Sequence, residues 1–295
     1  MSKNVSEIFS IVIEKLSNTE RVRNGNIIVG SSNARKYRYV RDCLSNFMRL
    51  SMKRDFRELT FTDIDEIFLL RYVEYLNGHN VENKLQMFRR IFREANVSTA
   101  VFDKIKIARV PSVAEKPVDH SCISKIIQMD SSRLSVREQL YVDLFLFGYY
   151  TGGSTINELA TLRRNDVQYG YLYCKRISSE KVAKVLLCEE AINIIDKYSD
   201  QSYGEYLLPI FTRKHTTVEQ QTGRIKRMTE LTNQTLKKVA KILHLKCELT
   251  MSITKRIYIE LMLFNNIPFD KITISVGCAI ETIIRYHEKM IAMRE

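Results

Sequence analysis

The sequence has few of the features that mark zinc-binding or disulfide-rich proteins. Its cysteines never form a CxxC pair, and its five histidines show no metal-ligand spacing. In a chain of 295 residues this pattern argues against a zinc site and predicts reduced thiols, as in a cytosolic protein. The six cysteines are Cys43, Cys122, Cys174, Cys188, Cys247 and Cys278.

Long apolar runs are also missing. No run approaches a membrane span, and the first residues lack the basic start and apolar core of a signal peptide. We find no internal repeat and no low-complexity tract. With 45% hydrophobic and 27% charged residues, the composition is that of a globular protein. We therefore expect a cytoplasmic protein with no membrane partner and no metal site.

Positive charge is the main excess. The formal net charge is +12 and the isoelectric point is about 9.4. A polyanion is therefore the first partner to consider. A solvated basic surface would give the same balance, so the charge is informative only where it clusters on defined elements.

The first third of the chain predicts four helices, over 5–18, 33–52, 61–76 and 83–95, with a turn-rich link over 24–33. In helix 61–76, Thr62 and Asp63 are candidate caps, and Ile64, Ile67, Phe68 and Leu70 are expected to face inward. Helices 33–52 and 83–95 carry basic outer faces that suit a phosphate backbone, although the charges could also serve solubility alone. The candidate DNA-binding residues on these faces are Arg35, Lys36, Arg38, Arg41, Lys84, Arg89, Arg90 and Arg93.

A second domain follows a proline-containing stretch. We place a linker at 111–119, between domains at 1–110 and 120–295. Helices are expected over 121–129, 135–150, 190–198, 229–245, 252–264, 270–276 and 280–293, and strands over 170–176 and 183–187. The predicted fold class is mainly α with a small antiparallel β-sheet.

The stretch 144–167, LFLFGYYTGGSTINELATLRRNDV, organises this second domain. An apolar run meets Gly152 and Gly153, which permit a tight turn, and Ser154 or Thr155 then caps a new helix. A helix–turn–helix joint without chemistry would explain this stretch alone.

Together with 203–230 and 249–289, the stretch resembles the catalytic domain of tyrosine recombinases, the phage integrase family, of the type found in Bacteroides mobile elements. The first domain is similar to the SAM-like core-binding domain of that family. The resemblance implies a double-stranded DNA partner, no small-molecule substrate and no cofactor. In such enzymes a tyrosine oxygen attacks a DNA phosphate, cations stabilise the transition state, and an acid protonates the leaving oxygen.

Several positions that match the family's catalytic residues hold other residue types. The first arginine position falls on Gly152, Ser154 or Thr155, and the hairpin lysine aligns with Ser178, three residues before Lys181, a possible substitute. The later motif gives Ser252 and Lys255, with Arg256 next to it. A lysine lacks the planar fork with which arginine binds phosphate.

The end of the chain departs in the same way. Cys278 stands at the histidine position after Gly277, and His287 falls where the nucleophile is expected, one residue after Tyr286. Tyr286 is therefore either a packing residue or a displaced nucleophile.

Two functions follow, and the sequence leaves open whether the chain is an enzyme. The first is a DNA-binding recombinase-like protein with an impaired strand-transfer site, acting around integration or recombination of a mobile element. The alternative is an active site-specific recombinase that forms a 3′-phosphotyrosyl intermediate through Tyr286, assisted by Lys181, Lys255 and Arg256. A basic run supplies further candidate DNA contacts: Arg213, Lys214, Arg224, Lys226 and Arg227.

The last residues suggest one more role. The resemblance implies exchange of a C-terminal tail between protomers, and 288–295 is a short amphipathic candidate. A homo-oligomer on DNA is therefore a third expectation.

Overall fold

The structure is a computed structural model that describes residues 4–23, 26–29, 32–78, 80–105 and 121–292. The chain divides into two compact units, Met1–Val110 and Pro111–Glu295. The linker expected at 111–119 lies outside the described residues.

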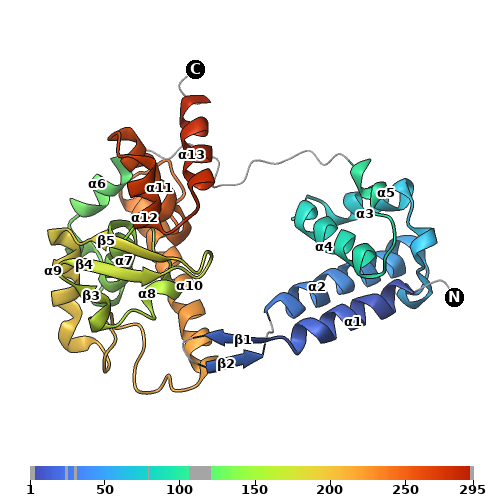
Figure 1. Ribbon diagram of the computed structural model, residues 1–295, viewed down its shortest axis with the longest axis horizontal. Helices are drawn as coiled ribbons and strands as arrows, with labels where there is room; N and C mark the ends of the chain where they lie inside the picture. The colour runs from blue at the N-terminus through green and yellow to red at the C-terminus, as the bar shows by residue number, and fades with distance from the viewer. Residues whose placement is uncertain (1–3, 24–25, 30–31, 79, 106–120, 293–295) are drawn as a thin grey trace. The chain divides into compact units, whose positions relative to one another are not determined.

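Unit 1 is a helical bundle, shown in blue to cyan in Figure 1. Its helices are α1 (Val5–Ser17), α2 (Ser32–Phe47), α3 (Glu66–Leu76), α4 (Val81–Glu94) and α5 (Ala100–Asp103). Side-chain oxygens cap two of them, because Asn4 accepts from the backbone of Ser6 and Asp65 accepts from the backbone of Phe68. A turn of π-helix, Met48–Met52, extends α2.

Aromatic rings fill the core of unit 1. Phe88, on α4, is fully buried and contacts Phe9, Tyr72, Phe92 and Phe102 at centroid distances of 5.6 to 6.2 Å. Three of these four pairs are edge-on, the arrangement that aromatic quadrupoles favour. This core holds α1, α3, α4 and α5 together.

Two expectations for unit 1 were wrong. The link expected over 24–33 contains strand β2 (Asn26–Val29), which pairs antiparallel with β1 (Glu20–Arg23). Asn24-Gly25 between two runs with branched residues is a hairpin signal that the sequence reading overlooked. In α3, Ile67 and Leu70 are 61% and 49% exposed, and Leu69 and Tyr72 are buried instead. The helix begins only after Asp65, so the inward stripe is shifted.

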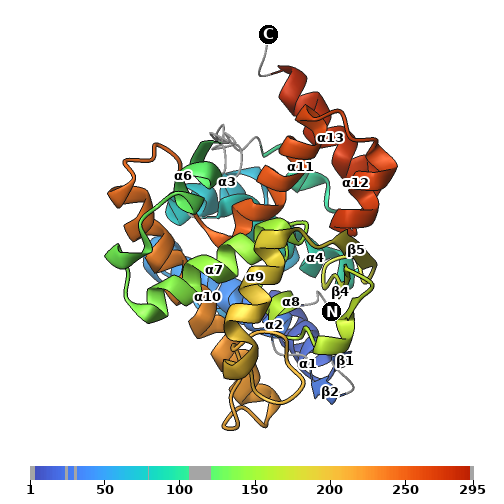
Figure 2. The same cartoon turned by 90° about the vertical axis from the view of Figure 1, so that its left-hand side faces the viewer.

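Helix α7 (Val136–Tyr150) matches the helix expected over 135–150 and lies in the core of unit 2. Leu144, Phe145 and Phe147 are buried, and the helix packs against α9 (Glu189–Tyr198), α10 (Val218–Ile242) and α11 (Thr254–Phe264), as Figure 2 shows. The remaining helices are α6 (Ser121–Ile127), α8 (Ile156–Leu159), α12 (Phe269–Val276) and α13 (Ile280–Ala292).

A three-stranded antiparallel sheet completes unit 2. Its strands are β3 (Val167–Gln168), β4 (Tyr171–Lys175) and β5 (Val182–Leu186), in the order β3-β4-β5. The sequence reading gave β4 and β5 and missed the short β3. Leu172, Cys174, Ala183 and Val185 point into the protein, and α12 packs on β5. The predicted fold class, mainly α with a small antiparallel sheet, is confirmed.

Helix α10 is longer than expected. It begins at Val218, eleven residues before the predicted start at 229, and Thr217 and Gln220 form a capping box there. Arg224, Lys226 and Arg227 therefore lie on a helix. Among the described residues, none of the helices has the length and hydropathy needed to cross a bilayer.

Candidate functional site

The glycine turn after α7 lies at the centre of unit 2. Gly152 and Gly153 have φ angles of +72° and +79°, a region that side chains rarely adopt. A Cβ on Gly153 would stand 2.1 Å from the Cα of Lys255, so only glycine permits this approach to α11. The turn then leads to Thr155, whose side chain caps α8.

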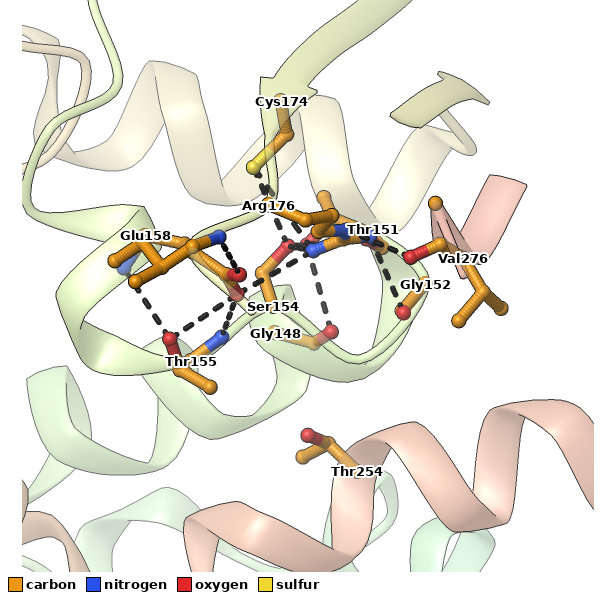
Figure 3. A network of polar contacts seen from close by, with 12 residues as sticks. Gly148, Thr151, Gly152, Ser154, Thr155, Glu158, Cys174, Arg176, Thr254 and Val276 are labelled. Atoms are coloured by element: carbon orange, nitrogen blue, oxygen red, sulfur yellow. Dashed lines mark hydrogen bonds and ion pairs between the residues drawn. The ribbon is translucent and has the colours of Figure 1, made fainter. Parts of the chain in front are cut away.

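The guanidinium of Arg176, at the end of β4, fills the space beneath this turn (Figure 3). Arg176 is only 2% exposed. Its Nη2 donates to the carbonyls of Thr151 (2.8 Å), Gly152 (3.2 Å) and Ser275 (3.2 Å), and its Nη1 donates to Ser154 Oγ at 2.6 Å. Its Nε donates to the carbonyl of Val276 at 2.9 Å.

Glu158 balances the charge of Arg176. Its Oε2 lies 3.6 Å from Arg176 Nη1, with the two side chains 6% and 2% exposed. The same carboxylate accepts from the backbone N–H groups of Thr155 and Ile177. A buried ion pair of this kind is maintained only when its remaining polar atoms are also satisfied.

The loop between β4 and β5 rests on the junction of α12 and α13. Ser179 Oγ donates to the carbonyl of Gly277 at 2.6 Å, and Lys181 Nζ lies 3.5 Å from the carbonyl of Cys278. The backbone N–H of Arg176 donates to the carbonyl of Lys181 at 2.8 Å. Lys181 is therefore held next to Cys278.

The pKa of the Cys278 thiol depends on the charged groups around it. Burial raises its pKa, whereas Lys255, Lys181 and Arg176 oppose this shift. The structure thus brings Lys181 and Lys255 to the same residue, one from the hairpin and one from the start of α11. Lys181 is exposed and Lys255 is half-buried, so both ammonium groups can reach an anion in solvent.

Arg256 lies next to this place with its charge already paired. Its Nε donates to Glu260 Oε1 at 2.6 Å, and both side chains are 8% exposed. Successive residues of a helix are rotated by about 100°, so Arg256 points in a different direction from Lys255, as expected.

Tyr286, on α13, packs against the apolar cluster formed by α11, α12 and α13. Burial raises the pKa of its phenol, Arg256 opposes this shift, and Glu260 and Cys278 add to it. His287 points to Phe269, with the ring centroids 5.2 Å apart. Tyr286 and His287 both make packing contacts here, and burial favours the protonated form of the Tyr286 phenol.

The other positions that match family catalytic residues offer no cation. Gly152 contributes its carbonyl to Arg176, and Thr155 caps α8. Ser178 is an exposed loop residue, and Ser252 Oγ lies 2.8 Å from the hydroxyl of Thr250. The cationic groups near the junction thus come from Lys181, Lys255, Arg176 and Arg256.

The basic run of unit 2 lies in the loop before α10 and along its first turns. Arg213 and Lys214 are exposed in the loop, whereas Arg224 is half-buried and donates from Nε to the carbonyl of Ile210 at 2.8 Å. Lys226 and Arg227 are exposed on α10, 3.9 and 3.8 Å from the carboxylate of Glu230. These weak surface pairs leave the cations open to another anion.

Unit 1 separates its basic residues into two groups. Arg35, Lys36, Arg38, Arg90 and Arg93 are exposed. Arg41 pairs with Asp42 at 3.0 Å. Lys84 is 6% exposed under the ring of Tyr39, contrary to its expected place on the outer face, and Arg89 is 22% exposed and pairs with Asp103 at 2.7 Å. These last two residues join elements within the unit.

Sequence reasoning missed Arg176, Glu158 and Glu260. The signal for Arg176 was present, because strand alternation puts it on the same inward side as Leu172 and Cys174. Thr155 and Glu158 also have the spacing of a capping box. Within the described ranges, no three histidine, cysteine or acidic side chains gather to hold a metal ion.

Comparison with known proteins agrees with this architecture. Residues 4–103 match the model of the phage integrase SAM-like domain. The fold is similar to the Tn1549 transposon integrase in complex with a circular intermediate DNA, with 13% identity, a TM-score of 0.59, and coverage of 97% of this chain and 95% of that chain. It is also similar to a lambda integrase dimer bound to a COC′ core site, with 12% identity, a TM-score of 0.64, and coverage of 97% and 95%.

At these identities the solved structures establish the fold, which is that of the integrases. Unit 1 carries the SAM-like domain match, and both units together are covered by the structural matches. The curated protein sequences contain no match to this chain.

Proposed function

We propose that this chain binds duplex DNA and acts in integration or recombination of a mobile element, with an impaired strand-transfer site. The observation that carries the DNA partner is the set of exposed cations on an integrase fold. On α10 and the loop before it these are Arg213, Lys214, Lys226 and Arg227. The Tn1549 and lambda integrases to which the fold is similar were solved with DNA.

Two buried guanidinium groups support the impairment. Arg176 is bound to carbonyls and Glu158, and Arg256 is bound to Glu260. Neither can turn toward a phosphate without leaving a buried carboxylate unpaired, which is strongly unfavourable. Lys181 and Lys255 are then the cations left at the junction, and a lysine gives a phosphate a single point charge where arginine gives a fork.

A titration of labelled duplex by fluorescence anisotropy tests the DNA partner. We expect binding at 50 mM salt that weakens linearly on a log–log plot as salt rises, because cations on the protein displace counterions. The double variant Arg213→Gln/Lys214→Gln should bind more weakly with a shallower slope. A chain that does not bind at 50 mM salt would contradict the proposal.

A covalent-capture experiment tests the impairment. The protein is incubated with a pool of nicked duplexes of random sequence, and covalent protein–DNA complexes are isolated under denaturing conditions. We expect no complex above the level given by Tyr286→Phe.

The alternative, an active recombinase, is favoured by one feature of the site. Lys181 Nζ lies 3.5 Å from the carbonyl of Cys278, and Lys181 and Lys255 both oppose the burial-induced rise in the pKa of the Cys278 thiol. In this alternative the two lysines stabilise the phosphorane, and the phenol loses its proton only when DNA is bound. A covalent complex that disappears in Tyr286→Phe would establish this function in place of the first.

We also propose that the C-terminal tail, 288–295, supports a homo-oligomer on DNA. Residues 288–292 are the end of α13, where Ile291 is 47% exposed, and 293–295 lie outside the described residues. Light scattering should give a larger particle with duplex than the sum of one chain and one duplex. Ile291→Glu should reduce it to that sum, whereas Glu288→Gln should not.

A further inference from the structure

The donors of the Arg176 guanidinium are saturated inside the protein. Its contacts reach two separate segments, namely the turn with Thr151, Gly152 and Ser154, and the end of α12 at Ser275 and Val276. Figure 3 shows these groups converging on one side chain. Because the side chain is 2% exposed, Arg176 cannot itself touch a ligand.

Two glycines make this convergence possible. A Cβ on Gly152 would lie 2.9 Å from Arg176 Nη2 and 2.4 Å from the carbonyl oxygen of Ser275. A Cβ on Gly277 would lie 2.7 Å from Arg176 Cγ. The backbone on both sides is therefore fitted to the arginine, so a longer or shorter side chain would not make the same contacts.

The segments joined by Arg176 also carry the two lysines at the junction. Lys255 lies against Gly153, the next residue of the turn, and Lys181 accepts at its carbonyl from the N–H of Arg176. The side chain of Lys181 reaches Cys278, two residues after Val276. The Arg176 side chain thus links the turn that carries Gly153, next to Lys255, to the end of α12, next to the Cys278 carbonyl that Lys181 approaches.

We propose that Arg176 is a positioning residue that fixes Lys181 and Lys255 relative to each other, so that both lysines meet phosphates of one bound duplex. The inference rests on the proposed DNA partner. Arg176 holds the two segments in place, because its planar guanidinium donates to carbonyls on both of them. The duplex contacts are made by the lysines.

The substitution Arg176→Lys tests whether the shape of the guanidinium matters in addition to its positive charge. Lysine keeps the positive charge beside Glu158 but cannot bridge the same carbonyls. Each phosphate contact contributes about 0.9 to the slope of log affinity against log salt, so loss of one or both lysine contacts should lower the slope by about 1 to 2. An arginine that only stabilised the fold would leave the slope of the folded variant unchanged.

A double-mutant cycle tests whether Arg176 affects DNA binding through Lys181 and Lys255. Lys181→Gln/Lys255→Gln should lower the slope by about the same amount as Arg176→Lys, and combining all three changes should lower it no further. An additive decrease would overturn the proposal, because Arg176 would then act on other contacts.

Ser179→Ala provides a test that does not disturb a buried charge. It removes the bond to the carbonyl of Gly277 and should loosen the hairpin loop, lowering the slope by about 1 through Lys181 alone. Ser199→Ala is the matched control, since Ser199 Oγ makes a similar bond to Asp196 on α9. If Arg176→Lys does not fold, Ser154→Ala takes its place, because it removes the acceptor of Arg176 Nη1. An unchanged slope in Ser154→Ala would then overturn the proposal.

The outcomes separate this inference from the function on which it rests. If the unaltered chain does not bind duplex at 50 mM salt, both fall. If it binds and the slopes of Arg176→Lys and Ser179→Ala equal that of the unaltered chain, only the positioning role of Arg176 is overturned.

Discussion

Unit 2 uses arginine in two opposite ways. At the turn after α7, Arg176 is 2% exposed and its guanidinium is bound on every side by protein groups. On α10, the Arg227 side chain is 61% exposed and has a long contact of 3.8 Å to Glu230. The first arginine joins segments of the fold, whereas the second leaves its charge available. Residue type alone therefore does not identify a DNA contact in this chain.

The largest expected effect is the loss of the buried charge. Arg176→Met leaves Glu158 and several carbonyls without their donor, so the free energy of unfolding should fall by about 3–5 kcal/mol. Urea unfolding followed by circular dichroism measures the change.

The matched substitution on the surface is Arg227→Met. It should change the free energy of unfolding by no more than about 0.5 kcal/mol. Equal losses in the two variants would remove the distinction between the two arginines.

The glycine turn provides the next test. Gly153→Ala places a Cβ against the backbone of Lys255 and forces a residue with φ of +79° to carry a side chain. We expect a loss of about 2–4 kcal/mol in unfolding free energy. Gly170→Ala is the control, because Gly170 has a similar φ of +76° but nothing within 4 Å, and it should lose only about 1–2 kcal/mol.

Much of this architecture was predictable from the sequence. The apolar run of α7, the two glycines after it and the cap at Ser154 or Thr155 predicted the turn, and aromatic and branched residues predicted β4 and β5. Strand alternation puts position 176 on the inward side, but Arg176 was not among the predicted site residues. Charged residues are rarely buried. A strand pattern predicts which way a side chain points. It does not predict the carbonyls that accept hydrogen bonds from Arg176, which belong to residues about 25 and 100 positions away in the sequence.

Contacts between elements also explain why some basic residues of unit 1 were placed wrongly on the outer face. Periodicity correctly gave α4 and its apolar face, but Lys84 and Arg89 are engaged inside unit 1 by Tyr39 and Asp103. Which cation has an internal partner depends on neighbouring elements, and one helix does not reveal them. The roles assigned to Tyr286, Lys181 and Lys255 remain predictions.

A salt bridge between helices should have a smaller effect that depends on pH. The hydrogen bond from Lys238, with the N–H and hydroxyl of Ser135, lowers the pKa of Glu138 to about 2. Because the folded pKa is depressed, the stabilisation is present above the unfolded pKa of about 4.3 and is lost as pH falls toward 2. Lys238 is half exposed, so we expect Glu138→Gln to lose at most about 1 kcal/mol at pH 7, with the difference shrinking below pH 4.

Thermal unfolding between pH 7 and pH 3 measures this difference. Glu219→Gln removes an exposed carboxylate in the first turn of α10 that forms no ion pair with the described part of the chain, and it should show little pH-dependent change. A difference for Glu138→Gln that stays constant with pH would mean that its charge contributes nothing.

The smallest effect on stability is expected for the exposed cations of α10. These residues differ most from the buried Arg176. Lys226 and Lys241 lie on one helix, 15 residues and thus about 22 Å apart, and both are exposed. Lys226→Gln and Lys241→Gln should each change unfolding free energy by no more than about 0.5 kcal/mol. Both remove one charge, so a general effect of net charge on DNA would be equal for the two variants. A DNA surface at the start of α10 instead requires that only Lys226→Gln lowers the salt slope, by about 1, in the anisotropy titration. Equal slopes would place the duplex away from this end of α10, even if the chain binds DNA.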